Sequence, residues 1–134
     1  IISGFGFYRS KAKYIQAAAA IVAKDFKGII PHDPVELQKL PGIGRKGAIA
    51  VISNAYPTYA NIGIPVDTHV IRFVKRFALT KATDPSKIEQ DLLQIIPKKD
   101  WKRGGYAIKE YGRKEGKPRG YKPELDPLVQ ILKE

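Results

Sequence analysis

The stretch "LPGIGRKGAIAV", residues 40–51, decides the fold. It places two glycines in a short turn between apolar segments, and Arg45 and Lys46 follow at once. This pattern predicts a helix-hairpin-helix, in which Gly42 and Gly44 adopt backbone conformations denied to other residues and turn their N–H groups outward. Such amides at the start of a helix suit a phosphate oxygen. The alternative is a glycine-rich corner between two helices that binds no ligand.

The charge of the chain favours a polyanionic partner. Its 134 residues include 24 Lys and Arg against 13 Asp and Glu, a formal net charge of +11. A basic excess spread along the sequence favours nucleic acid, with an anionic membrane surface as the weaker alternative. The longest apolar run, at 17–23, is too short to span a bilayer, and no signal-peptide pattern opens the chain. We therefore expect an intracellular protein.

Residue types that the chain lacks exclude several chemistries. It has no cysteine, which excludes disulfides, thiolate nucleophiles and cysteine-held zinc or iron–sulfur clusters. Its two histidines are too few for a histidine-built metal site, so we predict no metal. It also has no methionine and begins Ile1-Ile2, although an initiator methionine is normally removed only before a small residue. The sequence is therefore expected to be a piece of a longer product.

Apolar side chains recur at helical spacing along most of the chain, and no stretch alternates as a strand would. The predicted fold class is all-α. Proline and glycine make residues 56–65 a loop. Three helices are predicted with an N-cap residue: one at 11–26 capped by Ser10, one from Pro34 to just before Pro41 capped by Asp33, and one at 68–79 capped by Asp67. A further helix is predicted from Asp84-Pro85 to Ile96, and others at 45–55, 99–112 and 127–134.

Lys46 is the candidate nucleophile. It lies near the start of an otherwise apolar helix, where an apolar wall would remove water from its ammonium group and the neighbouring Arg45 would also favour the neutral amine. A neutral amine attacks a carbonyl or a sugar C1′. A phosphate-binding or solvated lysine is the commoner alternative at such a position.

Asp67 has two compatible roles. Its place before "THVIRFVKRFAL" makes it an N-cap, which explains the residue fully. Helix N–H groups also hold a capping carboxylate ionised and in place, so that it could face a positive charge developing on a substrate.

Four motifs in collinear order resemble the endonuclease III family of DNA glycosylase/AP lyases, within the helix-hairpin-helix, Gly/Pro-rich loop, Asp superfamily. They are "GFYRSKA" (6–12), "LPGIGRKGA" (40–48), "VDTHVIRFVKR" (66–76) and "YGRKEGKPRGYKPELDPL" (111–128). The resemblance implies a helix-hairpin-helix DNA glycosylase fold, comprising part of the six-helix barrel and a C-terminal helical region.

The same resemblance implies how the chain is organised. Residues 1–134 would form a single all-α unit, with a portion of the glycosylase core at 1–80 and its hairpin at 40–45. Residues 81–134 would form the C-terminal helical region, with a loop at 112–126 that lacks the family's metal cluster.

The resemblance also assigns roles to single residues. Lys46 matches the nucleophile that attacks C1′ and forms a Schiff base, and Asp67 matches the aspartate that assists the attack and stabilises the sugar cation. Phe7 lies where the family places an apolar wedge beside the extruded nucleotide, the alternative being an ordinary core aromatic. The residues expected to contact DNA are Gly42, Ile43, Gly44, Arg45, Phe7, His69 and Arg72. For His69 and Arg72, burial or surface solvation is an equal alternative.

Relatives in this family hold a [4Fe–4S] cluster with four cysteines, and the chain departs from that pattern. The corresponding positions carry Gly116, Pro123, Asp126 and Leu132, none of which supplies a thiolate, so we expect no cluster and no other cofactor. Packing of Leu125, Leu128 and Ile131 is expected to order this loop instead.

The family's core also begins well before the position of Ile1. We therefore expect a fragment of a longer glycosylase, or a chain completed by self-association. In the isolated piece, activity is expected to be low or absent.

The implied function is base excision repair by a bifunctional DNA glycosylase/AP lyase in the cytoplasm or nucleoid. Its partner would be double-stranded DNA with a damaged base or an abasic site, and no membrane. A non-catalytic DNA-binding helix-hairpin-helix module is the alternative, and an RNA-binding or ribosome-associated basic protein is a third. The preferred lesion stays open between an oxidised pyrimidine, which is the family default, and uracil or another mismatch product.

Overall fold

A computed structural model of the protein describes residues 1–115 and 121–132, and these residues form helices and turns with no strand. The predicted all-α class is confirmed. The chain divides into two units, Ile1–Pro65 and Val66–Glu134. The sequence-based boundary after residue 80 lies inside the second unit, because the helix that begins at Thr68 packs against the one that begins at Trp101.

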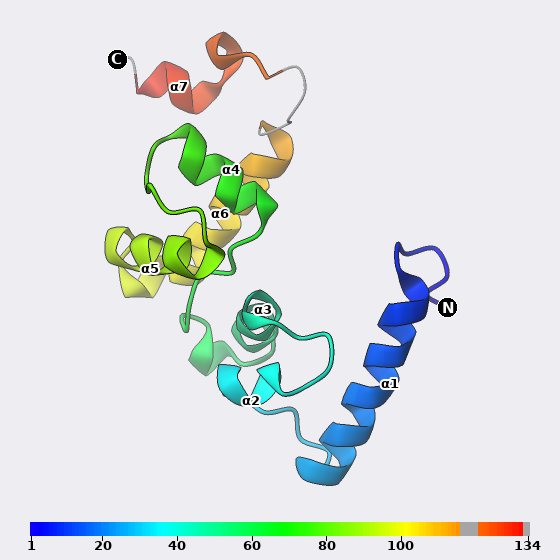
Figure 1. The fold of residues 1–134 in the computed structure, drawn as a ribbon. Coiled ribbons are helices and arrows are strands. Elements are labelled where there is room, and N and C mark those ends of the chain that lie inside the picture. The colour runs from blue at the N-terminus through cyan, green and yellow to red at the C-terminus, as the bar shows by residue number, and fades with distance from the viewer. Residues whose placement is uncertain (116–120, 133–134) are drawn as a thin grey trace. The chain divides into compact units, whose positions relative to one another are not determined.

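The first unit contains three α-helices and a short 3₁₀ turn (Figure 1). These are α1 (Tyr8–Asp25), α2 (Pro34–Gln38), α3 (Arg45–Ala55) and η1 (Pro57–Tyr59). As predicted, α3 is central, with Ala48, Ile49 and Ile52 almost fully buried. Leu37 and Leu40, from α2 and the residues after it, complete this core. Burial of these side chains fixes α2 against α3 on either side of the glycine turn.

Helix α1 begins earlier than the sequence suggests. The prediction that Ser10 caps it is wrong, because the helix already begins at Tyr8 and Phe7 takes the N-cap position without a side-chain hydrogen bond. The amide of Lys11 donates to the Phe7 carbonyl at 3.0 Å, which closes the first turn ahead of Ser10. Phe7 itself has φ 58°, in the left-handed region that non-glycine residues rarely adopt.

The apolar stripe of α1 is only partly covered within the first unit. None of its residues is fully buried, although Ala18, Ile21 and Val22 pack against the core. An open apolar hollow of about 460 Å³ lies along this stripe, lined by Ala18, Ala19, Val22, Ala23, Gly28, Ile30, Leu37, Leu40, Ile43 and Val51. The first unit therefore leaves apolar surface exposed along α1.

The second unit is built around the pair α4 and α6 (Figure 1). Its elements are α4 (Thr68–Arg76), α5 (Pro85–Ile95), η2 (Lys98–Asp100), α6 (Trp101–Lys114), η3 (Pro123–Leu125) and α7 (Pro127–Ile131). A Cβ added to Gly112 would lie 2.9 Å from the Cβ of His69 and 3.0 Å from its carbonyl oxygen. Glycine at 112 thus lets α6 approach the start of α4 closely.

Four helices begin with an aspartate whose carboxylate accepts backbone N–H groups, as the sequence predicts for three of them. These N-caps are Asp33 for α2, Asp67 for α4, Asp84 for α5 and Asp126 for α7. Each satisfies amides that would otherwise lack an acceptor at the start of the helix.

The C-terminal segment is ordered differently from the prediction. Packing of Leu125, Leu128 and Ile131 was the expected cause, but Leu125 is 66% exposed and Ile131 63% exposed, so this prediction is wrong. The buried residue of the segment is instead Asp126, which is 2% exposed. Gly116, one of the four positions matched to cluster cysteines, lies outside the described residues.

Candidate active site and DNA-binding surface

The hairpin turn requires glycine at position 42 for two reasons. Gly42 has φ 80°, where a side chain is strained, and an added Cβ would lie 2.9 Å from Cγ and Cδ2 of the Tyr14 ring. The special conformation predicted for Gly42 is therefore confirmed. For Gly44 the same prediction is wrong, because its φ of −93° and ψ of −179° form an extended backbone that any residue adopts.

Gly44 is the N-cap of α3 and offers the helix no side-chain cap. An added Cβ at Gly44 would meet nothing within 4 Å, so the space in front of the helix is open. The amides of Lys46 and Gly47, in the first turn, have no acceptor within α3 because of helix geometry. This arrangement suits a phosphate oxygen, as the sequence suggests.

Ile43 and Arg45, on either side of Gly44, differ in how far their side chains are buried. Ile43 packs its side chain against the core, and its amide donates to the Leu40 carbonyl at 3.1 Å. Arg45, by contrast, is exposed in the first turn of α3. Ile43 thus shapes the turn from inside, while Arg45 adds positive charge beside the open amides. Their contact with DNA stays a prediction.

Lys46 lies in the first turn of α3, and its side chain is exposed. The expected apolar wall around this lysine is therefore absent from the first unit taken by itself. The apolar neighbours Ala48 and Ile49 turn into the core instead. Lys46 thus extends from a rigid helix start next to the glycine turn.

Asp67 caps α4 with one of its two carboxylate oxygens. Its Oδ1 accepts the amide of His69 at 2.8 Å and that of Val70 at 3.0 Å. The predicted cap is confirmed, and the side chain is half-buried. A role of this carboxylate toward a substrate stays a prediction. Lys46 belongs to the first unit and Asp67 to the second.

His69 and Arg72 lie one turn apart on α4 and contact each other. A guanidinium nitrogen of Arg72 lies 2.8 Å from Nδ1 of His69. Because arginine can only donate, Nδ1 accepts and the proton of the neutral ring lies on Nε2. Both side chains are half-buried, so neither full burial nor full surface solvation, the two alternatives left open by the sequence, describes them. A role in holding phosphates stays a prediction.

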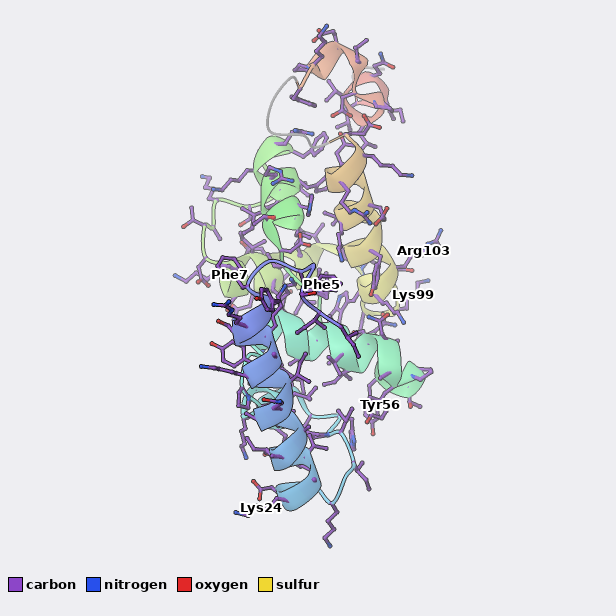
Figure 2. The ribbon with its side chains drawn as sticks, turned by 90° about the vertical axis from the view of Figure 1, so that its right-hand side faces the viewer. Phe5, Phe7, Lys24, Tyr56, Lys99 and Arg103 are labelled. Atoms are coloured by element: carbon purple, nitrogen blue, oxygen red, sulfur yellow. The ribbon has the colours of Figure 1, made fainter. Side chains whose placement is uncertain are left out.

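Phe7 is not a core residue. Its side chain is 87% exposed at the N-terminal end of α1, and Figure 2 shows it there together with Phe5. Its left-handed backbone costs about 1–2 kcal/mol for a residue other than glycine. An exposed aromatic ring on a strained helix start gives the fold no stability, which favours a functional role. The wedge itself stays a prediction.

Sequence reasoning did not single out Tyr14, Phe5, Lys99 or Arg103. Tyr14 underlies the turn at Gly42, and its only signal was an aromatic residue on the apolar side of α1. Phe5 is 62% exposed, with Nζ of Lys11 lying 5.7 Å from its ring centroid. Lys99, in η2, and Arg103, near the start of α6, are basic residues (Figure 2).

Neither a metal site nor a membrane span is found where the structure describes the chain. No group of three or more His, Asp or Glu side chains in residues 1–115 and 121–132 could hold a metal ion. In the same ranges, no helix is both long and apolar enough to cross a membrane.

Comparison with known proteins identifies the family. The model of the HhH-GPD superfamily of base excision DNA repair proteins matches residues 1–98. The chain is 44% identical to an endonuclease III of a Synechocystis species over 113 residues, which are 84% of this chain and 51% of that protein. It is 37% identical to endonuclease III of Bacillus subtilis over 134 residues, or 99% of this chain and 60% of the relative.

Solved structures agree with the sequence relatives. A trapped endonuclease III–DNA covalent intermediate, with an estranged adenine, matches with a TM-score of 0.88 and 36% identity over 97% of this chain and 60% of that chain. A non-covalent endonuclease III–DNA complex matches equally well. The chain therefore belongs to the HhH-GPD superfamily, and it is similar to endonuclease III within it. It spans between about half and three-fifths of the length of these relatives.

Proposed function

We propose that the chain is the part of a base excision repair enzyme that holds the DNA backbone and supplies the nucleophile of a bifunctional DNA glycosylase/AP lyase. The observation that carries this proposal is the start of α3. An exposed lysine, Lys46, follows a glycine turn at which α3 has no side-chain cap and the space beside Gly44 is open. The net charge of +11 would draw the chain to double-stranded DNA carrying a damaged base or an abasic site.

DNA binding of this kind would be blind to base sequence. The hairpin amides and Arg45 would bind phosphate oxygens, which fix register and orientation but carry no base information. Each phosphate contact releases counterions, so affinity would fall steeply with salt. A protein with this partner would act at the nucleoid or elsewhere in the cytoplasm.

The chemistry would begin when Nζ of Lys46, as the neutral amine, attacks C1′ of an extruded nucleotide. The bond between C1′ and the base nitrogen breaks, the base leaves with a proton, and the carboxylate of Asp67 offsets the positive charge on the sugar. Opening of the sugar ring gives a Schiff base between Lys46 and C1′. Loss of a C2′ proton then expels the 3′ phosphate, and water releases the lysine.

Extrusion would precede chemistry, because C1′ and the base are out of reach inside a stacked duplex. The exposed ring of Phe7 could fill the space that the nucleotide leaves, at a cost of a few kcal/mol for unstacking. Damaged and mispaired bases unstack more easily, which would add selectivity.

Borohydride trapping on duplex DNA with a single abasic site tests the proposal. Borohydride reduces the Schiff base to a stable amine, so even a slow reaction accumulates a covalent adduct. We expect an adduct with the unaltered chain, and none with Lys46→Gln although its DNA binding persists. Lys39→Gln is the matched control, because it removes the same charge from an exposed lysine just before the turn.

Three results would decide against this function. An adduct that persists in Lys46→Gln would assign the nucleophile to another amine. Tight, salt-sensitive binding of abasic DNA without any adduct would instead favour a non-catalytic DNA-binding module. Structured RNA that outcompetes abasic duplex DNA would favour the RNA-binding alternative.

A further inference from the structure

The buried carboxylate of Asp126 divides its two oxygens between two tasks. Its Oδ1 accepts the amide of Leu128 at 3.0 Å and so caps α7. Its Oδ2 accepts the hydroxyl of Tyr121 at 2.7 Å and also that of Tyr111. Because Tyr111 lies on α6 and Tyr121 on the segment that leads to α7, one oxygen joins these two parts of the second unit.

A cation from a third element balances this carboxylate. The guanidinium of Arg76, at the end of α4, lies 3.6 Å from Oδ2 of Asp126. Its central carbon also lies 3.5 Å from the ring centroid of Tyr121, a cation–π contact. The Arg76 side chain is only 17% exposed, so water screens the pair weakly. A buried carboxylate is tolerated only with such partners.

Aromatic rings support the group from the side of α4. The ring of Tyr111 meets that of Phe73 edge-on at 5.2 Å and lies 5.9 Å from that of Phe77. The Phe73 and Phe77 rings lie 4.8 Å apart. Their packing holds the Tyr111 hydroxyl in place, and it pairs α4 with α6 at the same point.

Protonation of the group is well defined at neutral pH. Burial alone would raise the pKa of the Asp126 carboxyl, but hydrogen bonds from Tyr111, Tyr121 and backbone amides outweigh it and hold that pKa below its ordinary value of 3.8. Burial, and then the hydrogen bond to Asp126, raise the pKa of Tyr111 to about 12. The group therefore contains one carboxylate, one guanidinium and two neutral phenols.

We propose that Asp126, Tyr111, Tyr121 and Arg76, here called the Asp126 network, fasten residues 121–132 to α4 and α6 in place of a metal cluster. The network joins three elements of the second unit through a single buried side chain. It uses side chains that stay in one protonation state across the neutral range. The proposal concerns only the holding of this segment, so it stands independently of the enzymatic function proposed above.

The residues at the positions of the family's cluster cysteines do not fit a cluster. Pro123 and Leu132 have no donor atom in their side chains. Asp126 has donors, but both oxygens are already engaged by the Leu128 amide and the two tyrosines. A [4Fe–4S] cluster needs four ligands, normally thiolates, and this chain has no cysteine. The segment therefore needs another means of attachment, which the network provides.

Hydrogen exchange of the backbone amides in the full chain tests the proposal. In the unaltered protein we expect the Leu128 and Gln130 amides to be protected, since both are hydrogen-bonded. Asp126→Ala should remove this protection while the amides of α4, α5 and α6 keep theirs. Asp84→Ala is the matched control, because it deletes another capping aspartate of the second unit. Its effect should be confined to the start of α5.

A second variant separates fastening from capping, and it serves if Asp126→Ala fails to fold. Tyr121→Phe deletes one hydroxyl donor and leaves the cap bond to Leu128 intact. Loss of one hydrogen bond to a charged group should lower the protection of α7 amides by about 10- to 100-fold. Tyr8→Phe, an exposed tyrosine of the first unit, should leave them unchanged. Unchanged protection of α7 in both Asp126→Ala and Tyr121→Phe would overturn the proposal.

Iron supplies an independent arm of the test. Protein prepared in iron-depleted medium, or treated with an iron chelator, should keep the same exchange pattern in residues 121–132. Loss of α7 protection on chelation would show that a metal holds the segment and would also overturn the proposal.

The pH range in which the amides of residues 121–132 stay protected follows from the pKa shifts of Asp126 and Tyr111. Because folding lowers the pKa of Asp126, this carboxylate contributes stability that is fully present above pH 3.8. That stability is lost as the pH falls through the lowered pKa of the folded protein. The raised pKa of Tyr111 contributes stability that is complete below pH 10.0 and is lost as the pH rises toward about 12. Tyr121 and Arg76 are the other titratable groups that act on Asp126 or Tyr111, and Glu124 acts on Tyr121. Tyrosinate absorbance should show Tyr111 ionising late, toward about pH 12, and Asp126→Ala should shorten this delay by removing the hydrogen bond that adds to the effect of burial.

Discussion

The starts of α3 and α4 solve the same physical problem in opposite ways. At α4, Asp67 accepts two backbone amides and places a negative charge where the helix dipole favours one. At α3, Gly44 provides no side-chain cap, and Arg45 and Lys46 add positive charge that the dipole disfavours. The start of α3 thus gives up local stability, and an anion from outside the chain would restore it.

Two other helices show that the arrangement at α4 is the ordinary one in this chain. Asp33 and Asp84 cap α2 and α5 with the same pair of hydrogen bonds, each through a single carboxylate oxygen. They provide reference sites at which a cap has no proposed chemistry. Variants at α3 and α4 can be compared with them, so that capping and function are separated.

The largest expected effect is the loss of charge at Asp67. Asp67→Asn keeps a good N-cap, since asparagine and aspartate cap about equally well, so stability should change by less than about 1 kcal/mol. The neutral amide can no longer offset positive charge on the sugar. Removing a group of this kind commonly slows a reaction by about 10²–10³-fold. Single-turnover formation of the borohydride adduct measures the rate, and urea unfolding measures the stability.

Asp84→Asn provides the control for this comparison. It makes the same chemical change at the start of α5, where the capping geometry is equivalent. It should leave the rate of adduct formation unchanged. Equal rates for Asp67→Asn and the unaltered chain would mean that Asp67 acts only as a cap.

The next largest expected effect is a difference in stability between variants of the two turn glycines, Gly42 and Gly44. Gly42→Ala should destabilise the protein by about 2–3 kcal/mol, because the left-handed backbone costs 1–2 kcal/mol with a side chain and the new methyl group would displace the Tyr14 ring. Gly44→Ala should change stability by less than about 0.5 kcal/mol, because its backbone is extended and its surroundings are open. Urea unfolding followed by circular dichroism measures both. Equal losses would contradict the described geometry of the turn.

These residues show what the sequence could and could not predict. Local chemistry was readable: Asp33, Asp67 and Asp84 cap their helices because the cap depends on residues two and three positions ahead. At the hairpin, the glycine pattern revealed the turn but not which glycine is left-handed. Nor could the sequence show that Tyr14, far earlier in the chain, packs so close to Gly42 that a Cβ there would not fit.

Errors arose where long-range contacts decide the outcome. The apolar residues around Lys46 suggested that water would be excluded from it, but in the first unit Ala48 and Ile49 are buried while Lys46 itself is exposed. In the C-terminal segment, apolar spacing pointed to leucine packing. The buried group is Asp126, which could not be recognised without its partners Tyr111 and Arg76 on other helices.

The smallest expected effect comes from making α3 begin as α4 does. Gly44→Asp should add a cap and raise stability by a few tenths of a kcal/mol. The same carboxylate would occupy the space proposed for a phosphate, so affinity for abasic duplex DNA should fall by about tenfold at roughly 0.1 M salt, and the salt slope should lose about one phosphate contact. Titration at several salt concentrations measures both quantities, with Gly44→Ala as the uncharged control. A more stable variant that binds DNA as tightly as before would mean that the open start of α3 is only a structural corner, and the phosphate contact would have to lie elsewhere on the basic surface.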